Sequence, residues 1–296
     1  MTDDSPTFTP LSPAIGMEVH GIDMSRPATP DTIARLNEVL SHNSILLFRD
    51  QDLTPERHIA FSRYFGELEP HVADQYNMPE HPEIFIVSNV VENGREIGAR
   101  GGARHWHSDY SYRERPSLGS LFHCLECPPE GGQTQFASMY TAYEALPDEK
   151  KRLLAGVRAV HDYNYYWTNY TPHREPLTEE QRRQVPPVAH PALRTHPVSG
   201  RRALYLAHQV VSHFEGMEFE ESQEIIEEIV SFATESRFVY THEWRPGDVI
   251  FWDNRSSMHR VLPFDEERHR RRMHRTTLKG DRPYLAPLPA ETDKAA

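Results

Sequence analysis

Short apolar runs separated by glycine and proline make up most of the sequence, and this punctuation limits how the chain can fold. There are 15 glycines and 24 prolines among 296 residues. Apolar runs that are bounded in this way and stay under about eight residues favour strands over helices. The predicted strands lie at 45–48, 84–88, 119–125, 133–137, 204–207, 238–244, 249–252 and 271–278. Many short strands with tight turns predict a mainly β protein, a sandwich or jelly roll with helical insertions.

Helical periodicity is concentrated early in the chain and in insertions between the strands. Apolar residues share one face over 31–40, and the Thr-Pro pair at 54–55 is a typical helix start. A helix over 139–154 is expected to break at Pro147, because proline interrupts helical hydrogen bonding. The segment 220–232 has the clearest amphipathic pattern.

The sequence predicts one folded domain, because no long linker divides it and no internal repeat is present. We place this domain at residues 13–285, with flexible ends at 1–12 and 286–296. A lid-like insertion is expected at about 155–190, since the stretch 163–170 is rich in aromatic residues. Core packing of these aromatic side chains is the alternative.

The overall charge narrows the range of partners. The chain has 32 Lys and Arg against 44 Asp and Glu, a formal net charge of −12. This balance argues against nucleic acid and against an anionic membrane surface. No apolar run is long enough to span a bilayer, and the first residues lack the apolar stretch of a secretory signal. With only two cysteines, the expected setting is the cytoplasm. We also expect a homo-oligomer.

One His-x-Asp motif, His107-Ser108-Asp109, stands out from the 18 histidines. A chance motif of this kind is expected about once in such a chain, so the motif alone carries little weight. In an extended chain, however, residues two apart point to the same face. An imidazole and a carboxylate could therefore bind one metal ion. Two histidines and one carboxylate form the facial triad of non-haem Fe(II) oxygenases.

The third ligand should be a distant histidine on a neighbouring strand, and we select His259. It follows the predicted strand at 249–252 and a polar turn. The alternative for any single histidine is a surface position or a hydrogen-bonded place in the core. The three residues His107, Asp109 and His259 together favour a metal site over that alternative.

A cationic segment, 268–275, supports an anion-binding site beside this motif. If it is a strand, Arg271 and Arg275 share its inward face. A buried arginine is costly unless it is paired with an anion, and its planar fork suits a carboxylate. An inward arginine here therefore indicates a bound organic acid. For Arg268, Arg270 and Arg272, surface salt bridges are the expected role.

Taken together, the motifs identify a family resemblance that covers about residues 11–284. The sequence resembles the taurine/2,4-dichlorophenoxyacetate dioxygenase family of Fe(II)- and 2-oxoglutarate-dependent enzymes. The resemblance rests on six motifs in order: 106–109 (WHSD), 131–134 (GGQT), 142–146 (AYEAL), 194–200 (RTHPVSG), 252–255 (WDNR) with His259, and 273–275 (MHR).

This resemblance implies a double-stranded β-helix, or jelly roll, that uses Fe(II), 2-oxoglutarate and O₂. By motif position, His107, Asp109 and His259 would bind iron. Thr134 and Arg271 would hold the distal carboxylate of 2-oxoglutarate. The remaining arginine, Arg275, would face the acidic group of the primary substrate.

Further positions would contact the substrate if they follow the family pattern. His71 matches a substrate-contacting histidine, although a surface-loop histidine is the alternative. Tyr112, Trp167 and Val210 stand where phenylalanine is expected, and Ala103 replaces a polar residue. These departures put taurine itself in doubt as the substrate.

The sequence therefore predicts a dioxygenase that hydroxylates a small organic anion and releases succinate and CO₂, with possible cleavage of a C–S or C–O bond. Candidate substrates are sulfonates, aryloxy or other carboxylates, and sulfate esters. The first alternative is a jelly-roll hydrolase or isomerase that uses the same three ligands without 2-oxoglutarate. The second is a non-catalytic binding protein in which the histidines are structural.

Overall fold

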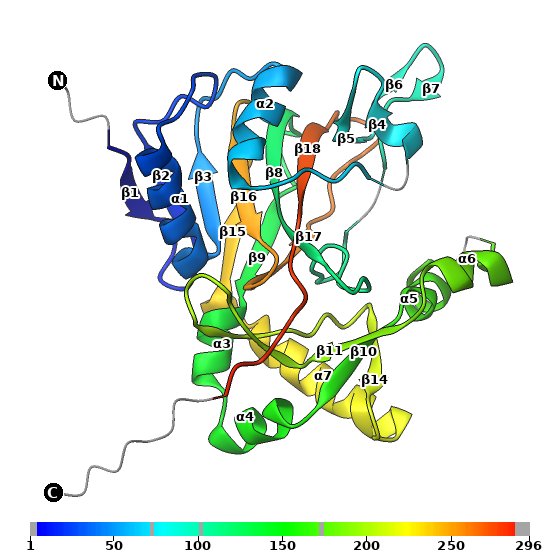
Figure 1. Cartoon of the computed structure of the whole chain (residues 1–296). Helices are drawn as coiled ribbons and strands as arrows, with labels where there is room; N and C mark the ends of the chain where they lie inside the picture. The colour runs from blue at the N-terminus through cyan, green and yellow to red at the C-terminus, as the bar shows by residue number, and fades with distance from the viewer. Residues whose placement is uncertain (1–4, 72–73, 101–102, 172–174, 288–296) are drawn as a thin grey trace, which may run out of the picture.

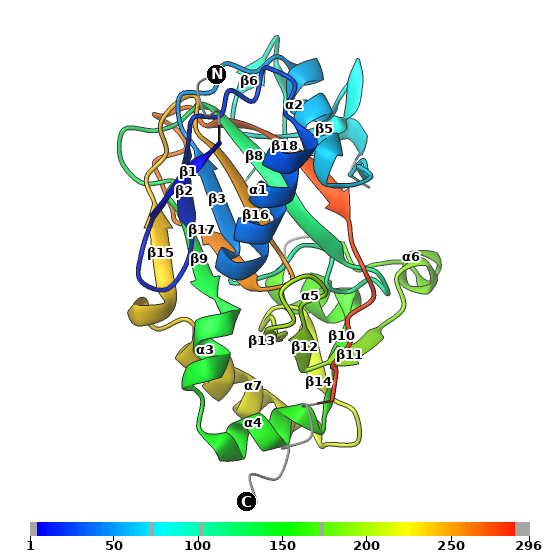
Figure 2. The same cartoon turned by 60° about the vertical axis from the view of Figure 1, so that its left-hand side comes forward.

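The computed structural model describes residues 5–71, 74–100, 103–171 and 175–287, and these residues form two layers (Figure 1). The upper layer consists mostly of strands, and the lower layer contains helices and two small antiparallel sheets (Figures 1 and 2). Among the described residues, no helix has the length and apolar character that a membrane crossing requires.

A large mixed sheet forms the back of the upper layer. Its strands are, in spatial order, β1 (Thr7–Pro10), β2 (Met17–His20), β3 (Ile45–Phe48), β16 (Val249–Asp253), β8 (Ser117–Glu126), β18 (Arg272–Lys279), β5 (His81–Ser88) and β4 (Asn77–Met78). Neighbouring strands are antiparallel except for β2 and β3, which run parallel. Strands far apart in the sequence are therefore neighbours at the centre of this sheet.

A smaller antiparallel sheet faces the large one and closes the jelly-roll core. It contains β15 (Val239–His242), β9 (Thr134–Ser138) and β17 (Ser257–Val261), with β9 in the middle. Buried side chains from both sheets fill the space between them, including Phe122, Phe136 and Trp252. The inner face of β18 carries Met273 into the same cluster, as the alternation of strand side chains requires.

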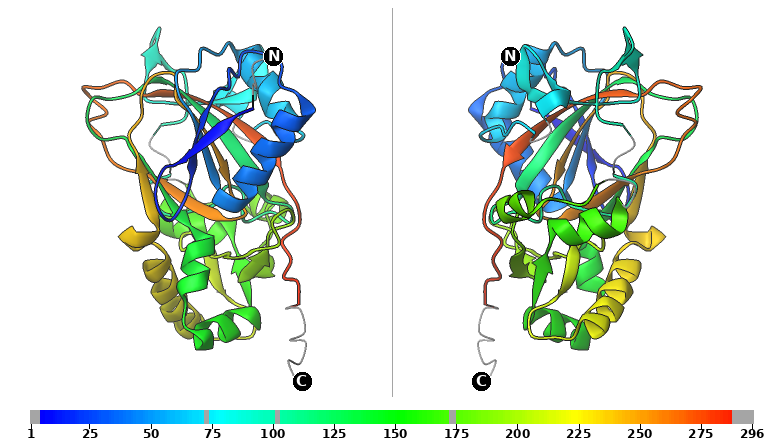
Figure 3. Two further views of the ribbon diagram at one scale, coloured as in Figure 1. Left: turned by 90° about the vertical axis from the view of Figure 1, so that its left-hand side faces the viewer. Right: turned by 90° about the vertical axis from the view of Figure 1, so that its right-hand side faces the viewer.

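Two helices cover the outer face of the large sheet (Figure 3). These are α1 (Pro30–Asn43) and α2 (Pro55–Ser62), and a short 3-10 helix, η1 (Arg63–Phe65), follows α2. The helix α2 begins as predicted, with Thr54 capping its first turn and Pro55 following. Thr29 and Pro30 form the same arrangement at the start of α1, one residue before the predicted start. Leu36, Phe61 and other apolar residues pack against the outer side chains of the strands.

The lower layer combines helices with short strands. Its elements are α3 (Met139–Ala145), α4 (Asp148–Ala155), β10 (Arg158–His161), α5 (Tyr163–Tyr170), α6 (Glu179–Gln184), β11 (Val188–Pro191), β12 (Leu193–Thr195), β13 (Arg202–Leu204), β14 (Val211–Phe214) and α7 (Phe219–Ala233). The predicted break at Pro147 separates α3 from α4. Minor elements elsewhere are η2 (Asp74–Tyr76), β6 (Val91–Glu92), β7 (Arg95–Glu96) and η3 (Ser236–Phe238).

Three sequence-based expectations need correction. Residues 7–10, expected within a flexible N-terminus, form β1 because they pair with β2. The predicted strand at 204–207 ends at Leu204, since the carbonyl of Ala207 instead accepts hydrogen bonds from the turn at 210–211. At the other end, Ala286 is held by Thr195 rather than loose, while residues 288–296 lie outside the described part.

The predicted insertion at about 155–190 is only partly separate from the rest of the lower layer. Its strand β10 is the central strand of a sheet with β11 and β14. The helices α5 and α6 project beside this sheet (Figure 1). The aromatic stretch expected at 163–170 corresponds to α5, in which no residue is fully buried.

Three buried histidines lie between α2 and the large sheet. His123 and His274 are paired across β8 and β18, and His58 of α2 stands edge-on to His123. Burial, followed by the neighbouring His123, lowers the pKa of His58 to about 3. Burial and Arg272 likewise lower the pKa of His274 to about 4. These rings are therefore neutral in the folded protein at neutral pH.

This arrangement predicts acid destabilisation. Unfolded histidine has a pKa near 6.5, so below that pH the unfolded chain binds protons that the folded protein does not, and stability falls towards pH 4. In His58→Gln, the slope of the unfolding free energy against pH should decrease by about 1.4 kcal/mol per pH unit in this range. Chemical unfolding at several pH values measures the slope.

The control is Ser62→Ala, which removes a buried hydroxyl next to the same cluster without removing a titrating group. It should lower stability by a similar amount at every pH. An unchanged slope in His58→Gln would contradict the neutral state of this ring.

Candidate active site

The loop that carries the His-x-Asp motif meets β17, which carries His259, inside the core. The backbone N–H of His107 donates to the carbonyl of His259 at 3.1 Å, and the reverse hydrogen bond is 2.9 Å. His107 and His259 are therefore cross-strand neighbours, with ring centroids 4.2 Å apart. Asp109, two residues after His107, lies on the same side, before the chain turns at Tyr110 through a positive φ of 56°.

The side chains of His107, Asp109 and His259 converge on one point. One potential ligand atom from each lies within 4.8 Å of the others. The Nε2 atoms of His107 and His259 are each 3.9 Å from a different carboxylate oxygen of Asp109. All three residues are buried. The sequence-predicted triad is thus brought together from a loop and from β17.

The protonation states of this group suit a divalent metal ion. Burial lowers the pKa of both imidazoles, to about 3 for His259, so the rings are neutral and keep a free lone pair. Burial alone would raise the pKa of Asp109, but Arg275 and the two imidazoles outweigh it and hold the pKa below its usual range. A carboxylate with neutral imidazoles is the state that binds metal.

The hydrogen bonds also leave ligand atoms available. Nδ1 of His107 donates to the carbonyl of His105 at 2.8 Å, which directs Nε2 towards Asp109. Such a hydrogen bond on the second ring nitrogen is typical of metal-binding histidines. Oδ2 of Asp109 is buried and receives no hydrogen bond from a described residue. The three residues therefore fit a metal ion of the facial-triad type.

A cavity lies directly beside the triad. His107 and His259 are part of its lining, and Thr134, Arg271 and Arg275 supply further polar groups. The remaining lining residues are Val87, Ala103, Phe122, Trp252 and Val261. The cavity is thus largely apolar, and Arg271 and Arg275 are its two cationic groups among the described residues.

Arg271 is a buried cation without an anionic partner. Its side chain comes from the segment just before β18, and no carboxylate of the described chain lies within 4.0 Å of its guanidinium. Its Nε atom is buried without a hydrogen-bond partner among the described residues. Burial lowers the pKa of Arg271 to about 10, which still leaves it charged at neutral pH. An unpaired buried guanidinium indicates a site for an anion.

Thr134 has a fixed hydroxyl orientation that sequence reasoning missed. The indole N–H of Trp244 donates to Oγ1 of Thr134 at 2.9 Å. Because Oγ1 accepts this bond, its own proton is free to be donated into the cavity. Trp244 lies outside the motifs on which the resemblance rests, so no sequence signal indicated this contact.

Arg275 connects the cavity to the substrate residue proposed at position 71. Its Nη1 atom is 3.3 Å from Oδ1 of Asp109, and its guanidinium lies 5.1 Å from the ring centre of Phe85. His71 stacks on the same Phe85 ring, with the two ring centroids 3.9 Å apart. Burial and Arg275 lower the pKa of His71 to about 3, so a neutral ring faces this region.

Of the predicted substrate residues, only Arg275 lines the cavity; His71, Tyr112, Trp167 and Val210 do not. Tyr112 packs against Tyr163 of α5, with centroids 4.6 Å apart. Trp167 is one turn further along α5 and donates its indole N–H to the carbonyl of Glu175. Val210 is buried in the hydrophobic cluster of the lower layer.

Comparisons with known proteins agree with this geometry. The sequence model of the taurine catabolism dioxygenase TauD, TfdA family matches residues 7–277. The chain belongs to this family. Over 282 residues it is 34% identical to an alpha-ketoglutarate-dependent 2,4-dichlorophenoxyacetate dioxygenase of Cupriavidus pinatubonensis, covering 91% of this chain and 96% of that protein. It is 29% identical to an alpha-ketoglutarate-dependent sulfate ester dioxygenase of Pseudomonas putida, covering 93% and 89%.

Solved structures give the same result. A crystal structure of AAD-2 in complex with Mn(II) and N-oxalylglycine has a TM-score of 0.80 and 30% sequence identity, and the match covers 94% of this chain and 99% of that one. A taurine dioxygenase from Burkholderia xenovorans has a TM-score of 0.77 and 31% identity, with coverage of 94% and 92%.

These relatives confirm the predicted jelly roll and the predicted reaction class. The protein is a dioxygenase of the TauD, TfdA family that depends on alpha-ketoglutarate, which is 2-oxoglutarate. Fe(II) and O₂ are the further reactants that this class requires. The alternative of a hydrolase or isomerase without 2-oxoglutarate is not supported, and neither is a non-catalytic role.

The contact between Trp244 and Thr134 generates a prediction. Trp244→Phe keeps an aromatic ring but removes the N–H that orients the hydroxyl of Thr134. One hydrogen bond is worth about 1 kcal/mol, so the KM for 2-oxoglutarate should rise about fivefold with kcat little changed. Steady-state kinetics with succinate as the readout measures both constants.

Thr134→Ser is the matched control, because it retains a hydroxyl at the same place and should stay near the wild-type KM. If Trp244→Phe leaves the KM unchanged while Thr134→Val raises it, then the indole does not orient the hydroxyl.

Proposed function

We propose that His107, Asp109 and His259 bind one Fe(II) ion. The support is the convergence of two neutral imidazoles and one ionised carboxylate, with an unpartnered carboxylate oxygen between them. The bound ion would supply the activation of O₂ that oxidises the substrate, with 2-oxoglutarate as the co-reductant. The protein holds the ligand atoms in place through the two hydrogen bonds between His107 and His259.

Arg271 and Thr134 bind the distal carboxylate of 2-oxoglutarate in this proposal. The observation that carries it is the buried, unpaired guanidinium of Arg271 in the cavity that adjoins the triad. A carboxylate there would accept a two-pronged hydrogen bond from the guanidinium and a third from Thr134. The other end of the keto acid would then reach the metal, while Phe122, Val87 and Val261 exclude water from the space between.

The primary substrate is proposed to be a small organic anion: a sulfonate, an aryloxy or other carboxylate, or a sulfate ester. The relatives named above act on a 2,4-dichlorophenoxyacetate and on sulfate esters. Arg275 supplies a cation at the edge of the same cavity, and His71 adds a neutral imidazole beside it. Hydroxylation of the carbon next to oxygen or sulfur would let the product collapse with cleavage of that C–O or C–S bond.

Three further proposals concern the role of α5, the cellular compartment and the oligomeric state. Half-exposed aromatic side chains of α5 lie next to Tyr112 and would act as a lid. A cytoplasmic location is a further proposal, with which the two free thiols are compatible. A homo-oligomer stays a prediction from the general frequency of such assemblies.

Metal and cosubstrate binding can be tested together. Anaerobic addition of Fe(II) and 2-oxoglutarate to the metal-free protein should produce a weak charge-transfer band in the visible spectrum. His259→Ala should abolish the band because one of only three ligands is lost. Arg271→Gln should retain it but require much more 2-oxoglutarate.

Arg272→Gln is the matched control for this titration, since its side chain is the next one along and pairs with Glu92 outside the cavity. The proposal is wrong if competent wild-type protein gives no band, or if Arg271→Gln and Arg272→Gln titrate alike.

The role of Arg275 can be tested with a panel of anions. Succinate release should increase with at least one sulfonate, aryloxy carboxylate or sulfate ester. For that substrate, Arg275→Gln should raise KM about 10- to 100-fold, because a charge-assisted hydrogen bond is worth about 1.5–3 kcal/mol. The KM for 2-oxoglutarate should change less. Equal increases in both constants would contradict a substrate-binding role.

A further inference from the structure

A tight turn at residues 253–257 lies close to both chain segments that supply the proposed metal ligands. These are the loop with His107 and Asp109 and the strand with His259. The turn joins β16 to β17, so it leads directly into the strand that carries His259. The same turn also contacts the other part of the triad, because the carbonyl of Ser257 accepts a hydrogen bond from Ser108 at 3.0 Å. Ser108 stands between His107 and Asp109. The turn is therefore in contact with both segments that supply the proposed ligands.

One buried side chain in this turn, Asn254, contacts both Asp109 and Trp252 of β16 through a single atom. Its Oδ1 atom accepts the backbone N–H of Asp109 at 3.3 Å and the indole N–H of Trp252 at 3.0 Å. The Trp252 ring lies 4.7 Å from the ring of His259. A single amide oxygen thus links the backbone of one proposed ligand to the aromatic ring that packs on another.

Asn254 is itself held on every side. Its Nδ2 donates to Oγ of Ser117 at 3.2 Å, and its backbone N–H donates to the carbonyl of Leu118 at 2.8 Å. The neighbouring Gly119 allows this approach, because a Cβ there would come within 2.1 Å of the Trp252 carbonyl oxygen. The amide group therefore has one available orientation, with its oxygen towards Asp109.

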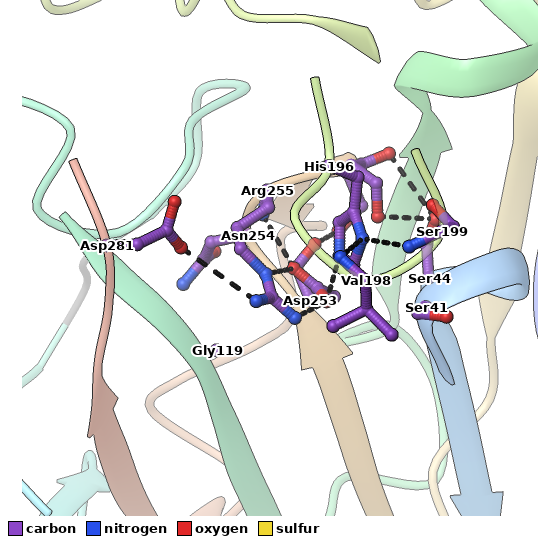
Figure 4. Close-up of polar contacts among 12 residues, drawn as sticks. Ser41, Ser44, Gly119, His196, Val198, Ser199, Asp253, Asn254, Arg255 and Asp281 are labelled. Carbon is purple, nitrogen blue, oxygen red and sulfur yellow. Dashed lines mark hydrogen bonds and ion pairs between the residues drawn. The ribbon is translucent and has the colours of Figure 1, made fainter. Parts of the chain in front are cut away.

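A buried ionic cluster fixes the turn on its other side (Figure 4). The fully buried carboxylate of Asp253 accepts hydrogen bonds from the guanidinium of Arg255 at 2.8 and 2.6 Å and from Nε2 of His196 at 3.0 Å. Arg255 also lies 3.8 Å from Asp281, in the chain that descends from β18. Removing one partner from a buried ion pair is costly, so this cluster resists rearrangement.

We propose that Asn254 is a positioning residue for the metal ligands, acting through the amide oxygen that joins Asp109 to the Trp252–His259 stack. It touches neither the metal nor the substrate in this account. Its action is to set where the carboxylate of Asp109 stands relative to the imidazole of His259. The inference rests on the proposed metal site, and it assigns a role to a residue outside the triad.

The test measures the metal-free protein and its binding of Mn(II) alone. Asn254→Ala removes both contacts, so hydrogen exchange at the Asp109 amide should become about fivefold faster in the metal-free protein. The dissociation constant for Mn(II), measured from the free ion by electron paramagnetic resonance, should rise about 10-fold or more. Asn254→Asp keeps an oxygen acceptor for both N–H groups and should recover most of the slow exchange. The additional buried carboxylate beside Asp109 should lower the melting temperature.

Two controls separate positioning from a general loss of stability. Ser117→Ala removes the contact to Nδ2 and the hydrogen bond from Ser117 to the Gly119 carbonyl, but neither contact of Oδ1. Ser62→Ala removes one hydroxyl of a buried pair on the far side of the sheet. Both should lower the melting temperature while leaving Mn(II) affinity and exchange at Asp109 close to wild type. The inference is overturned if Asn254→Ala changes neither quantity, or if Mn(II) affinity follows the melting temperature across all four variants. Failure of the wild-type protein to bind Mn(II) would instead overturn the proposed metal site, and the exchange measurement would still decide the role of Asn254.

Discussion

The pairing of buried charges determines how this structure is organised. A charge inside a protein is stable only with a partner, and most buried charges here have one within the chain. Asp253 is held by Arg255 and His196, and Arg194 is held by Asp281. Arg271 is the contrasting case, because it is buried beside the triad without an anion from the described chain. The paired charges stabilise the scaffold, and the unpaired one is where we propose that the cosubstrate binds.

The core of the site could be predicted because it depends on short sequence periods. The spacing of His107 and Asp109, two residues apart, placed both side chains on one face. The same period along β18 and the residue before it placed Arg275 and Arg271 towards the cavity. The fold class could also be predicted, since many short punctuated strands leave few alternatives to a sandwich or jelly roll. Local patterns of this kind survive folding because the backbone geometry itself imposes them.

Contacts between distant segments could not be predicted. Trp244 reaches Thr134 from 110 residues away, and Asn254 reaches Asp109 across 145. The motif that contains Asn254 was visible in the sequence, but nothing local indicated that its amide oxygen would accept a hydrogen bond from the backbone of Asp109. The substrate residues show the same limit: Tyr112, Trp167 and Val210 were assigned by motif position, and the packing of α5 and the lower layer decides where they lie. Pairing of β1 with β2 likewise depended on a partner outside its own segment.

The central claim is that one metal ion and the keto acid share the space between the triad and Arg271. The most direct test is a crystal structure of the protein grown without oxygen in the presence of Fe(II) and 2-oxoglutarate. The account predicts density for one ion contacted by His107, Asp109 and His259, and for a carboxylate against the guanidinium of Arg271 and the hydroxyl of Thr134. An ion bound by other residues, or a cosubstrate whose distal carboxylate lies away from Arg271, would contradict it.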